Sequence, residues 1–340
     1  LLLSNIIELN RDVEQYILQS AHSRAKHHYK DTTVPLTFVH SSDMHACESA
    51  WTRMVEFINH YEDTISFGLH TGDYCGGSQK VYKDLYGALS CNRTIYNCVG
   101  NHDCFSGERP WSLAEKHTAH SLLFSRSNEW GVNFMDCDYS MSYYKDFEQS
   151  NIRLIVLDDY YDLDDCRKWL KNLLDEALEK NLHVITAQHQ TTGYVNNTYN
   201  TKFHFLDDYN KLMRDYEAAR TEYAFDQRTQ EYFENVIAEF INKGGNYVCN
   251  LAGHDHVDQF GLTDDGILNV VVQNGTTWDA LGDTKRIKGT KSEDCFNVVS
   301  VDTTLNLIKI VRIGANVDHY LRTRNALTFD YKAKRVICEY

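Results

Sequence analysis

Short apolar runs alternate with helix-length segments along most of the chain, and polar loops separate them. In the first third, residues 36–39, 65–69 and 95–99 are apolar runs that predict strands. Residues 51–58 and 81–89 follow the first two runs and have the spacing of helices. A repeated order of strand, polar loop and helix is typical of α/β folds, in which crossover helices connect parallel strands.

The same order of elements returns in the second half of the chain. Residues 139–144 and 152–157 predict a pair of strands, and residues 166–178 predict an amphipathic helix. The next predicted elements are a strand at 184–187, a helix at 232–241 and a strand at 247–251. Residues 267–272, 296–301 and 307–313 are interpreted as a meander of strands in a second sheet. Two sheets flanked by helices are the simplest packing of these elements.

The predicted domain organisation is one large domain with extensions. Residues 34–315 hold the repeated elements, residues 1–33 read as an N-terminal helical extension, and residues 316–340 read as a C-terminal hairpin appendage. Residues 193–228 interrupt the order with many tyrosines and charged side chains. This insertion is interpreted either as a cap whose aromatic side chains stack on a substrate or as an ordinary helical excursion.

Composition narrows the class of protein and of partner. Of 340 residues, 42% are hydrophobic and 24% are charged, as in ordinary globular proteins. The formal net charge of −14 disfavours long nucleic acids and anionic membranes as partners, and a phosphorylated substrate would therefore need a local cation. No apolar run is long enough for a membrane span. Nothing in the composition indicates the oligomeric state.

The cysteines and the first residues bear on localisation. Ten cysteines without a C-x-x-C pair indicate reduced thiols and a cytoplasmic location. The apolar start of the sequence meets Glu8 and Arg11 too early for the core of a signal peptide. Because the sequence starts with Leu1 rather than Met, a removed leader stays open as an alternative.

Five predicted strands end in clusters of polar side chains. The clusters contain Asp43 and His45, then Asp73, then Asn101 and His102, then His189, and finally His254 and His256. Ligands of α/β proteins gather beyond the carboxyl ends of strands, so loops that are distant in sequence can converge there. Oxygen and imidazole donors without a thiolate suit zinc, manganese or iron.

Two metal ions are needed to use all of these donors. One tetrahedral site takes only about four ligands. Asp73 is the obvious bridge, because a carboxylate can hold two cations roughly 3.5 to 4 Å apart, where they clamp a phosphoryl oxygen. A water between them would have its pKa lowered toward about 7, which makes hydroxide available at neutral pH.

In order and in strand context, the segments DMH, GDY, GNHD, QH and GHDH resemble the five signature blocks of the calcineurin-like metallophosphoesterases. The resemblance spans roughly residues 36 to 275. It implies an α/β (α+β) fold, namely a four-layer αββα sandwich of two mixed β-sheets flanked by helices, with a dinuclear metal centre. Carried over block by block, it assigns Asp43, His45 and His256 to one metal, Asn101, His189 and His254 to the other, and Asp73 to both.

The resemblance also implies roles in catalysis and substrate binding. His102 would face the scissile phosphate and protonate the leaving oxygen, and Asp103 would orient its imidazole. The segment with Asn274 resembles the family's later substrate-side loop, and Tyr74 and Tyr194 are further candidates for substrate binding. The segment Ala187 to Gln190 departs from the family pattern, which often has a proline soon after the histidine.

The predicted function is hydrolysis of a phosphomonoester or phosphodiester by a hydroxide that bridges two metal ions of manganese, iron or zinc. A small phosphorylated metabolite or nucleotide is the expected substrate, because the acidic chain disfavours long nucleic acids. Three alternatives stay open. They are a binding module without turnover, a hydrolase of another bond such as an amide, and a structural protein on the same fold, for example one associated with a phage particle.

Overall fold

The computed structural model describes residues 33–75, 79–86, 90–103, 113–158, 163–190, 227–254, 256, 259–263, 265–275, 293–314 and 326–339. The N-terminal extension up to residue 32, residues 193–226 of the expected insertion, and Tyr194 lie outside them.

The first sheet combines three parallel strands with an antiparallel set from the end of the chain. Its order is β14-β13-β12-β11-β1-β2-β3. The strands are β1 (Leu36–Ser41), β2 (Phe67–His70), β3 (Ile95–Asn97), β11 (Cys295–Asp302), β12 (Leu307–Gly314), β13 (Ala326–Asp330) and β14 (Arg335–Glu339). β1 is parallel to β2, and β2 to β3, whereas β11 runs antiparallel to β1 with Leu36 opposite Val301.

The second sheet is also mixed, with the order β4-β5-β6-β7-β8-β10-β9. Its strands are β4 (Asn133–Phe134), β5 (Tyr143–Phe147), β6 (Ile152–Val156), β7 (His183–Ala187), β8 (Asn246–Ala252), β9 (Gln259–Leu262) and β10 (Leu268–Val271). β6, β7, β8 and β10 are parallel to one another, whereas β5 and β9 pair antiparallel with β6 and β10. Each sheet therefore points a block of parallel carboxyl ends toward one edge.

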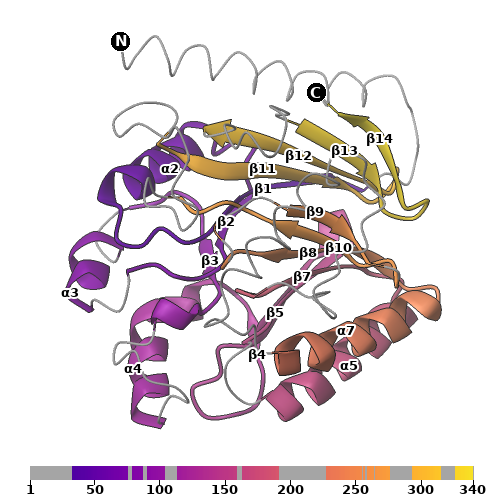
Figure 1. Cartoon of the computed structure of the whole chain (residues 1–340), viewed down its shortest axis with the longest axis horizontal. Coiled ribbons are helices and arrows are strands. Elements are labelled where there is room, and N and C mark those ends of the chain that lie inside the picture. The colour runs from indigo at the N-terminus through magenta and orange to yellow at the C-terminus, as the bar shows by residue number, and fades with distance from the viewer. Residues whose placement is uncertain are drawn as a thin grey trace, which may run out of the picture.

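The sheets stack face to face, and helices cover their outer faces (Figure 1). The described helices are α2 (Glu48–His60), α3 (Gln79–Val81), α4 (Leu113–Leu123), α5 (Leu163–Glu179) and α7 (Gln227–Asn242), with a π-helical turn at Tyr82–Tyr86. Phe67 of β2 stacks on Phe147 of β5 between the sheets. On the other face of β2, a Cβ on Gly68 would lie 3.1 Å from Ile58 of α2. The predicted four-layer fold class is confirmed.

Amphipathic patterning explains the outer layer on the second sheet. In α5 the buried side chains are Cys166, Leu170, Leu173, Leu174 and Ala177, which follow the helical repeat along one face. They form a core cluster with side chains of α7 and of the outer face of the second sheet. The all-buried pattern of β1 is typical of a strand covered on both faces.

Three expectations about the elements need correction or extension. The proposed meander is wrong, because β10 pairs with β8 and β9 in the second sheet, whereas β11 and β12 pair in the first. β5 covers 143–147 rather than 139–144. The expected C-terminal hairpin is formed by β13 and β14, and it continues the first sheet because β13 pairs with β12.

In the described part of the chain no helix combines the length and apolar character that a membrane crossing needs.

Candidate metal centre

The carboxyl ends of five strands carry the seven predicted ligands to one place. The loops after β1, β2 and β3 of the first sheet supply Asp43, His45, Asp73 and Asn101, and the loops after β7 and β8 of the second sheet supply His189, His254 and His256. Loop contacts join the two sheets here, since the His254 N–H donates to Asp43 Oδ2 at 2.9 Å.

The loops hold these side chains on unusual backbone. The φ angle is positive at five of the seven predicted ligands, namely Asp43 (52°), His45 (42°), Asp73 (59°), His254 (73°) and His256 (58°). Residues other than glycine seldom adopt this left-handed region, and such positions collect at active sites and ligand sites, where surrounding structure holds them. The backbone is thus shaped to turn these side chains inward.

The first group of donors consists of Asp43, His45 and His256. Their ligand atoms lie within 4.8 Å of one another. The Nε2 atoms of His45 and His256 are 2.9 Å apart, and His256 Nε2 lies 3.2 Å from Asp43 Oδ1. Asp43 is fully buried, and its Oδ1 accepts no hydrogen bond from the described residues.

The second group is built around His189. Its Nε2 lies 3.2 Å from Asp73 Oδ2 and 3.1 Å from Asn101 Oδ1. Asn101 Oδ1 also lies 2.9 Å from His254 Nδ1. Asp73 Oδ2 is 3.9 Å from His45 Nε2, so this carboxylate stands between the two groups. Asp43 Oδ1 is 3.9 Å from His189 Nε2 and likewise faces both.

The chemistry of these atoms fits a pair of cations. His189 donates its Nδ1 proton to the Thr71 carbonyl at 2.5 Å, so its neutral ring presents a lone pair at Nε2. That lone pair faces a carboxylate oxygen and an amide oxygen, which are acceptors too. Lone pairs that converge in a buried site are satisfied by a cation among them, and oxygen and imidazole donors suit zinc, manganese or iron.

Burial and charge set the protonation states that metal binding requires. Burial lowers the pKa of His254 to about 3 and also lowers the pKa of His45, whereas at His256 the Asp43 carboxylate outweighs burial and raises the pKa. Burial alone would raise the pKa of Asp43 and Asp73, but neighbouring imidazoles, His256 and His189 first among them, bring both below their usual values. Ligands must be neutral imidazoles and ionised carboxylates, and apart from that of His256 these shifts favour those forms.

His102 lies at the open rim of the centre. Its side chain is exposed, and its ring meets the His45 ring edge-on with centroids 5.3 Å apart. Its backbone N–H donates to Asp73 Oδ1 at 2.7 Å, which fixes the main chain beside the Asp73 carboxylate. The position leaves the imidazole free to meet a substrate from the solvent side.

Asp103 acts on the loops rather than on the His102 ring, contrary to the sequence interpretation. The carboxylate is fully buried and accepts the backbone N–H groups of Asp73, Gly100 and Tyr74 at 2.8–2.9 Å. Because these bonds take both oxygens, the carboxylate is turned inward. Asp103 therefore joins the loops after β2 and β3, which carry Asp73 and Asn101.

Two of the predicted substrate residues, Tyr74 and Asn274, lie in the interior. Tyr74 is 1% exposed, and its hydroxyl donates to Asn97 in the core. Asn274 is fully buried in the loop after β10, which the Gly275 N–H ties to the Ser42 carbonyl at 3.0 Å. The hydrogen bond of His189 to the Thr71 carbonyl could not be predicted, because a main-chain acceptor leaves no residue-type signal.

Gly253 allows the two sheets' loops to meet. A Cβ at this position would overlap Ser42 Oγ and lie 2.5 Å from Asp43 Oδ2. We expect Gly253→Ala to displace the Asp43 carboxylate, to lower metal content and to reduce the free energy of unfolding by about 1–3 kcal/mol through overpacking. Elemental analysis and denaturant unfolding measure the two effects.

Gly244→Ala is the matched control for that substitution. Gly244 has a φ of +90°, but a Cβ there would meet no atom of the described residues within 4 Å. It should cost some stability through backbone strain and leave metal content unchanged. Equal metal loss in both variants would contradict a local effect of Gly253 on Asp43.

A buried ion pair anchors the start of α2, just after His45. Arg53 Nη2 lies 2.8 Å from Glu293, whose side chain is 1% exposed, and Arg53 Nε donates to Asp294 at 2.7 Å. The Ser49 hydroxyl also donates to Glu293 at 2.7 Å. These bonds connect the residues just before β11 to α2, the helix that follows the loop with Asp43 and His45.

Removal of the Arg53 guanidinium should be costly because it leaves Glu293 buried without its cation. We expect Arg53→Ala to lower the free energy of unfolding by about 2–3 kcal/mol. Arg126→Ala is the control, since Arg126 and Glu129 are 66% and 54% exposed and such pairs contribute little. Urea unfolding that shows the same midpoint for both variants would contradict the anchoring role.

The geometry can be compared with known proteins. A family model described as calcineurin-like phosphoesterase matches residues 36–258. A dimetal phosphatase from Danio rerio is similar over 88% of this chain and 99% of its own, with 13% sequence identity and a TM-score of 0.53. GAP50, the anchor in the inner membrane complex of Plasmodium, is similar over 90% and 88%, with 12% identity and a TM-score of 0.44. No curated protein matches the chain.

Proposed function

The chain belongs to the calcineurin-like phosphoesterase family, and from this premise we propose that it hydrolyses phosphate esters of small metabolites or nucleotides at a dinuclear metal centre. The observation that carries the proposal is the convergence of seven oxygen and imidazole donors from five strand ends, with Asp73 between two groups. The similar fold of a protein described as a dimetal phosphatase supports it.

Each group of donors would hold one cation. Asp43, His45 and His256 would bind the first, and Asn101, His189 and His254 the second, with Asp73 contributing to both. When bound, such a pair supplies Lewis-acid stabilisation of phosphoryl oxygens and lowers the pKa of water toward about 7. Manganese, iron and zinc are all compatible with this donor set.

The residues around the donors have separate tasks. The Thr71 carbonyl fixes the tautomer and direction of the His189 ring. Asp103 holds the loops of Asp73 and Asn101 together through three backbone N–H groups. His102, exposed at the rim and fixed through its own N–H, would donate a proton to the oxygen of the departing alcohol.

The class of substrate follows from charge. A chain with a formal net charge of −14 repels long polyanions, so a small phosphorylated metabolite or nucleotide is favoured over nucleic acid. Both monoesters and diesters are compatible with the donor groups. A cytoplasmic location is part of the proposal, and eight free cysteines in the described part of the chain support it.

Metal analysis followed by a substrate screen tests the proposal. The purified full chain would be loaded in turn with Mn, Fe and Zn and assayed with p-nitrophenyl phosphate, bis-p-nitrophenyl phosphate and a panel of nucleotides. We expect about two metal ions per chain and release of nitrophenol or phosphate that EDTA abolishes. Stoichiometric metal without turnover of any phosphate ester would instead favour a binding or structural role on this fold.

A further inference from the structure

Two buried histidines, His40 of β1 and His70 of β2, each precede a proposed aspartate ligand by three residues. Neither side chain has exposed surface. Because side chains alternate along a strand, His40 lies on the same face as Phe38, which stacks on Phe67 between the two sheets. His70 lies on the opposite face, where its ring meets Trp51 of α2. The two histidines share burial and spacing but have different neighbours.

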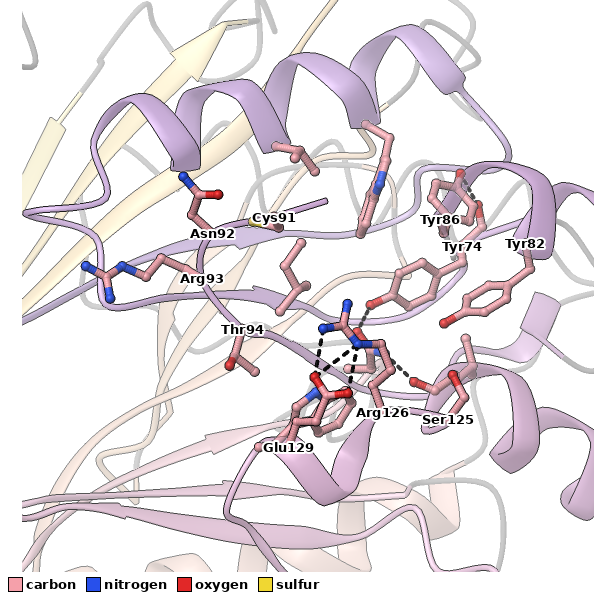
Figure 2. A pocket seen from close by; sticks show the side chains of 16 residues that line it. Tyr74, Tyr82, Tyr86, Cys91, Asn92, Arg93, Thr94, Ser125, Arg126 and Glu129 are labelled. Carbon is pink, nitrogen blue, oxygen red and sulfur yellow. Dashed lines mark hydrogen bonds and ion pairs between the residues drawn. The ribbon is translucent and has the colours of Figure 1, made fainter. Parts of the chain in front are cut away.

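The contacts of His70 are with the interior beneath α2. Its Nδ1 lies 2.9 Å from the Ser41 hydroxyl oxygen, and its ring centroid lies 4.0 Å from that of Tyr74. Tyr74, Tyr82 and Tyr86 line part of a cavity of about 270 Å³ beside β3 (Figure 2). None of these contacts is with one of the seven proposed ligands, so His70 is a matched comparison for His40.

His40 anchors the side chain of Thr71, the first residue after β2. His40 Nε2 lies 3.2 Å from the Thr71 hydroxyl oxygen, and that hydroxyl donates to the Ser41 carbonyl at 3.3 Å. A hydroxyl has one proton, so with this proton on the carbonyl the bond to His40 needs the proton of Nε2. His40 is therefore the donor, and its Nδ1 carries the lone pair.

The neighbours on the other side of the ring fit this tautomer. His40 stands opposite Asn297 of β11, and Asn297 opposite Arg312 of β12, so the three side chains form a row across the sheet. Arg312 Nε donates to Asn297 Oδ1 at 2.9 Å, which leaves the Asn297 NH₂ group for the side of His40. Neither this NH₂ group nor His40 Nδ1 has a hydrogen-bond partner among the described residues. The row thus offers a donor, rather than an acceptor, to Nδ1.

The peptide group after Thr71 carries this anchoring to a proposed ligand. The Thr71 carbonyl accepts the Nδ1 proton of His189 at 2.5 Å and the Ser42 hydroxyl proton at 3.2 Å. The next residue is Gly72, where a Cβ would lie only 2.6 Å from His189 Nδ1. The imidazole therefore lies directly against this peptide group. A rotation of the peptide would move His189 Nε2 from its place 3.2 Å from Asp73.

We propose that His40 and Thr71 are positioning residues of the second metal site, with His40 holding the Thr71 side chain and Thr71 holding His189. The hydroxyl fixes the torsion of Thr71, and the carbonyl of the same residue then selects the tautomer and direction of the His189 ring. Asn297 and Arg312 support His40 from the opposite side. The role in metal binding rests on the proposed function, whereas the hydrogen bonds themselves need no metal.

Solvent exchange of the His189 ring proton tests the arrangement in the metal-free full chain. With isotopically labelled histidine and EDTA-treated protein, the Nδ1–H resonance is identified by its absence in His189→Gln. We expect exchange at least about tenfold faster than in the wild type for His40→Leu and Thr71→Val, because the acceptor loses its fixed position. Thr71→Ser restores the hydroxyl and should keep the wild-type rate, as should His70→Leu. Equal acceleration in both histidine variants, or an unchanged rate in Thr71→Val, would overturn the proposal.

Metal affinities distinguish this role from a general effect on the centre. Chelator competition with Mn²⁺ on the full chain measures the binding of both ions. In Thr71→Val and His40→Leu, one ion should bind about 10- to 100-fold more weakly, the usual effect of losing an outer partner of a metal-ligating histidine, while the other ion is retained. Equal weakening of both ions would contradict a role at His189.

One further variant keeps the test decisive if His40→Leu does not fold. Arg312 is partly exposed, and Arg312→Met removes the donor to Asn297. We expect exchange of the His189 proton about two- to fivefold faster in this variant, and an unchanged rate would overturn the part assigned to His40. A wild-type chain that binds no metal would contradict the proposed function, and the exchange rates alone would then decide whether His40 and Thr71 position His189.

Discussion

Replacing Asp73 with asparagine is expected to abolish both metal retention and turnover. The carboxylate is 1% exposed, its Oδ2 lies 3.2 Å from His189 and 3.9 Å from His45, and its Oδ1 accepts the His102 N–H. The asparagine amide has about the same volume as the carboxylate but carries no charge. In place of one carboxylate oxygen, it presents an NH₂ group to the neighbouring lone pairs. We expect kcat/KM to fall at least about 1,000-fold, which corresponds to ~4 kcal/mol of transition-state stabilisation.

Metal per chain and nitrophenol release measure the two losses together. Asp175→Asn on α5 is the matched control, because it makes the same chemical change on a surface carboxylate that is 46% exposed and paired with Lys171. It should retain both metals and full rate. An Asp73→Asn variant with two metals and unimpaired turnover would contradict a place for this carboxylate between the cations.

Replacing His102 with alanine is expected to separate metal binding from catalysis. The side chain meets the His45 ring only edge-on, and the backbone N–H that binds Asp73 remains in the variant. Metal content should therefore stay at the wild-type level while kcat falls about 10²- to 10⁴-fold, the usual contribution of a general acid. His117→Ala, an exposed histidine on α4, should change neither.

The leaving group distinguishes proton donation from a general effect on the site. A nitrophenolate departs without help, so the loss in His102→Ala should be smaller for p-nitrophenyl phosphate than for an alkyl phosphate. A uniform loss across leaving groups would argue against proton transfer to the leaving oxygen. Loss of metal in step with the lost rate would show that His102 supports the ligands instead.

The cluster of proposed ligands could be predicted because the sequence shows both the donor residue types and their positions at the ends of predicted strands. Apolar runs that stop at aspartate, asparagine or histidine predict donors at strand ends, and parallel strands bring those ends together. The structure places all seven side chains accordingly, down to the carboxylate of Asp73 between two groups.

Other features could not be predicted, and each has a physical reason. The period of residues 267–272 predicts a strand but says nothing about its partner, and β10 pairs with β8 rather than with β11. Asp103 was given a role on His102 from adjacency in sequence, whereas a short helical turn directs its carboxylate to backbone N–H groups. Tyr74 follows Asp73, but the backbone turns at Asp73, where φ is 59°, and the Tyr74 ring lies in the core.

The pairing of β1 with β11 affects when the first sheet can be completed during synthesis of the chain. Leu36 stands opposite Val301, so β1 lacks one of its two neighbours until Cys295–Asp302 has been synthesised. Pairings between distant segments form slowly, because the intervening chain must first be closed into a loop. The nascent chain thus exposes an apolar strand edge through most of translation, and chaperone capture or early metal supply should raise the yield of the folded protein.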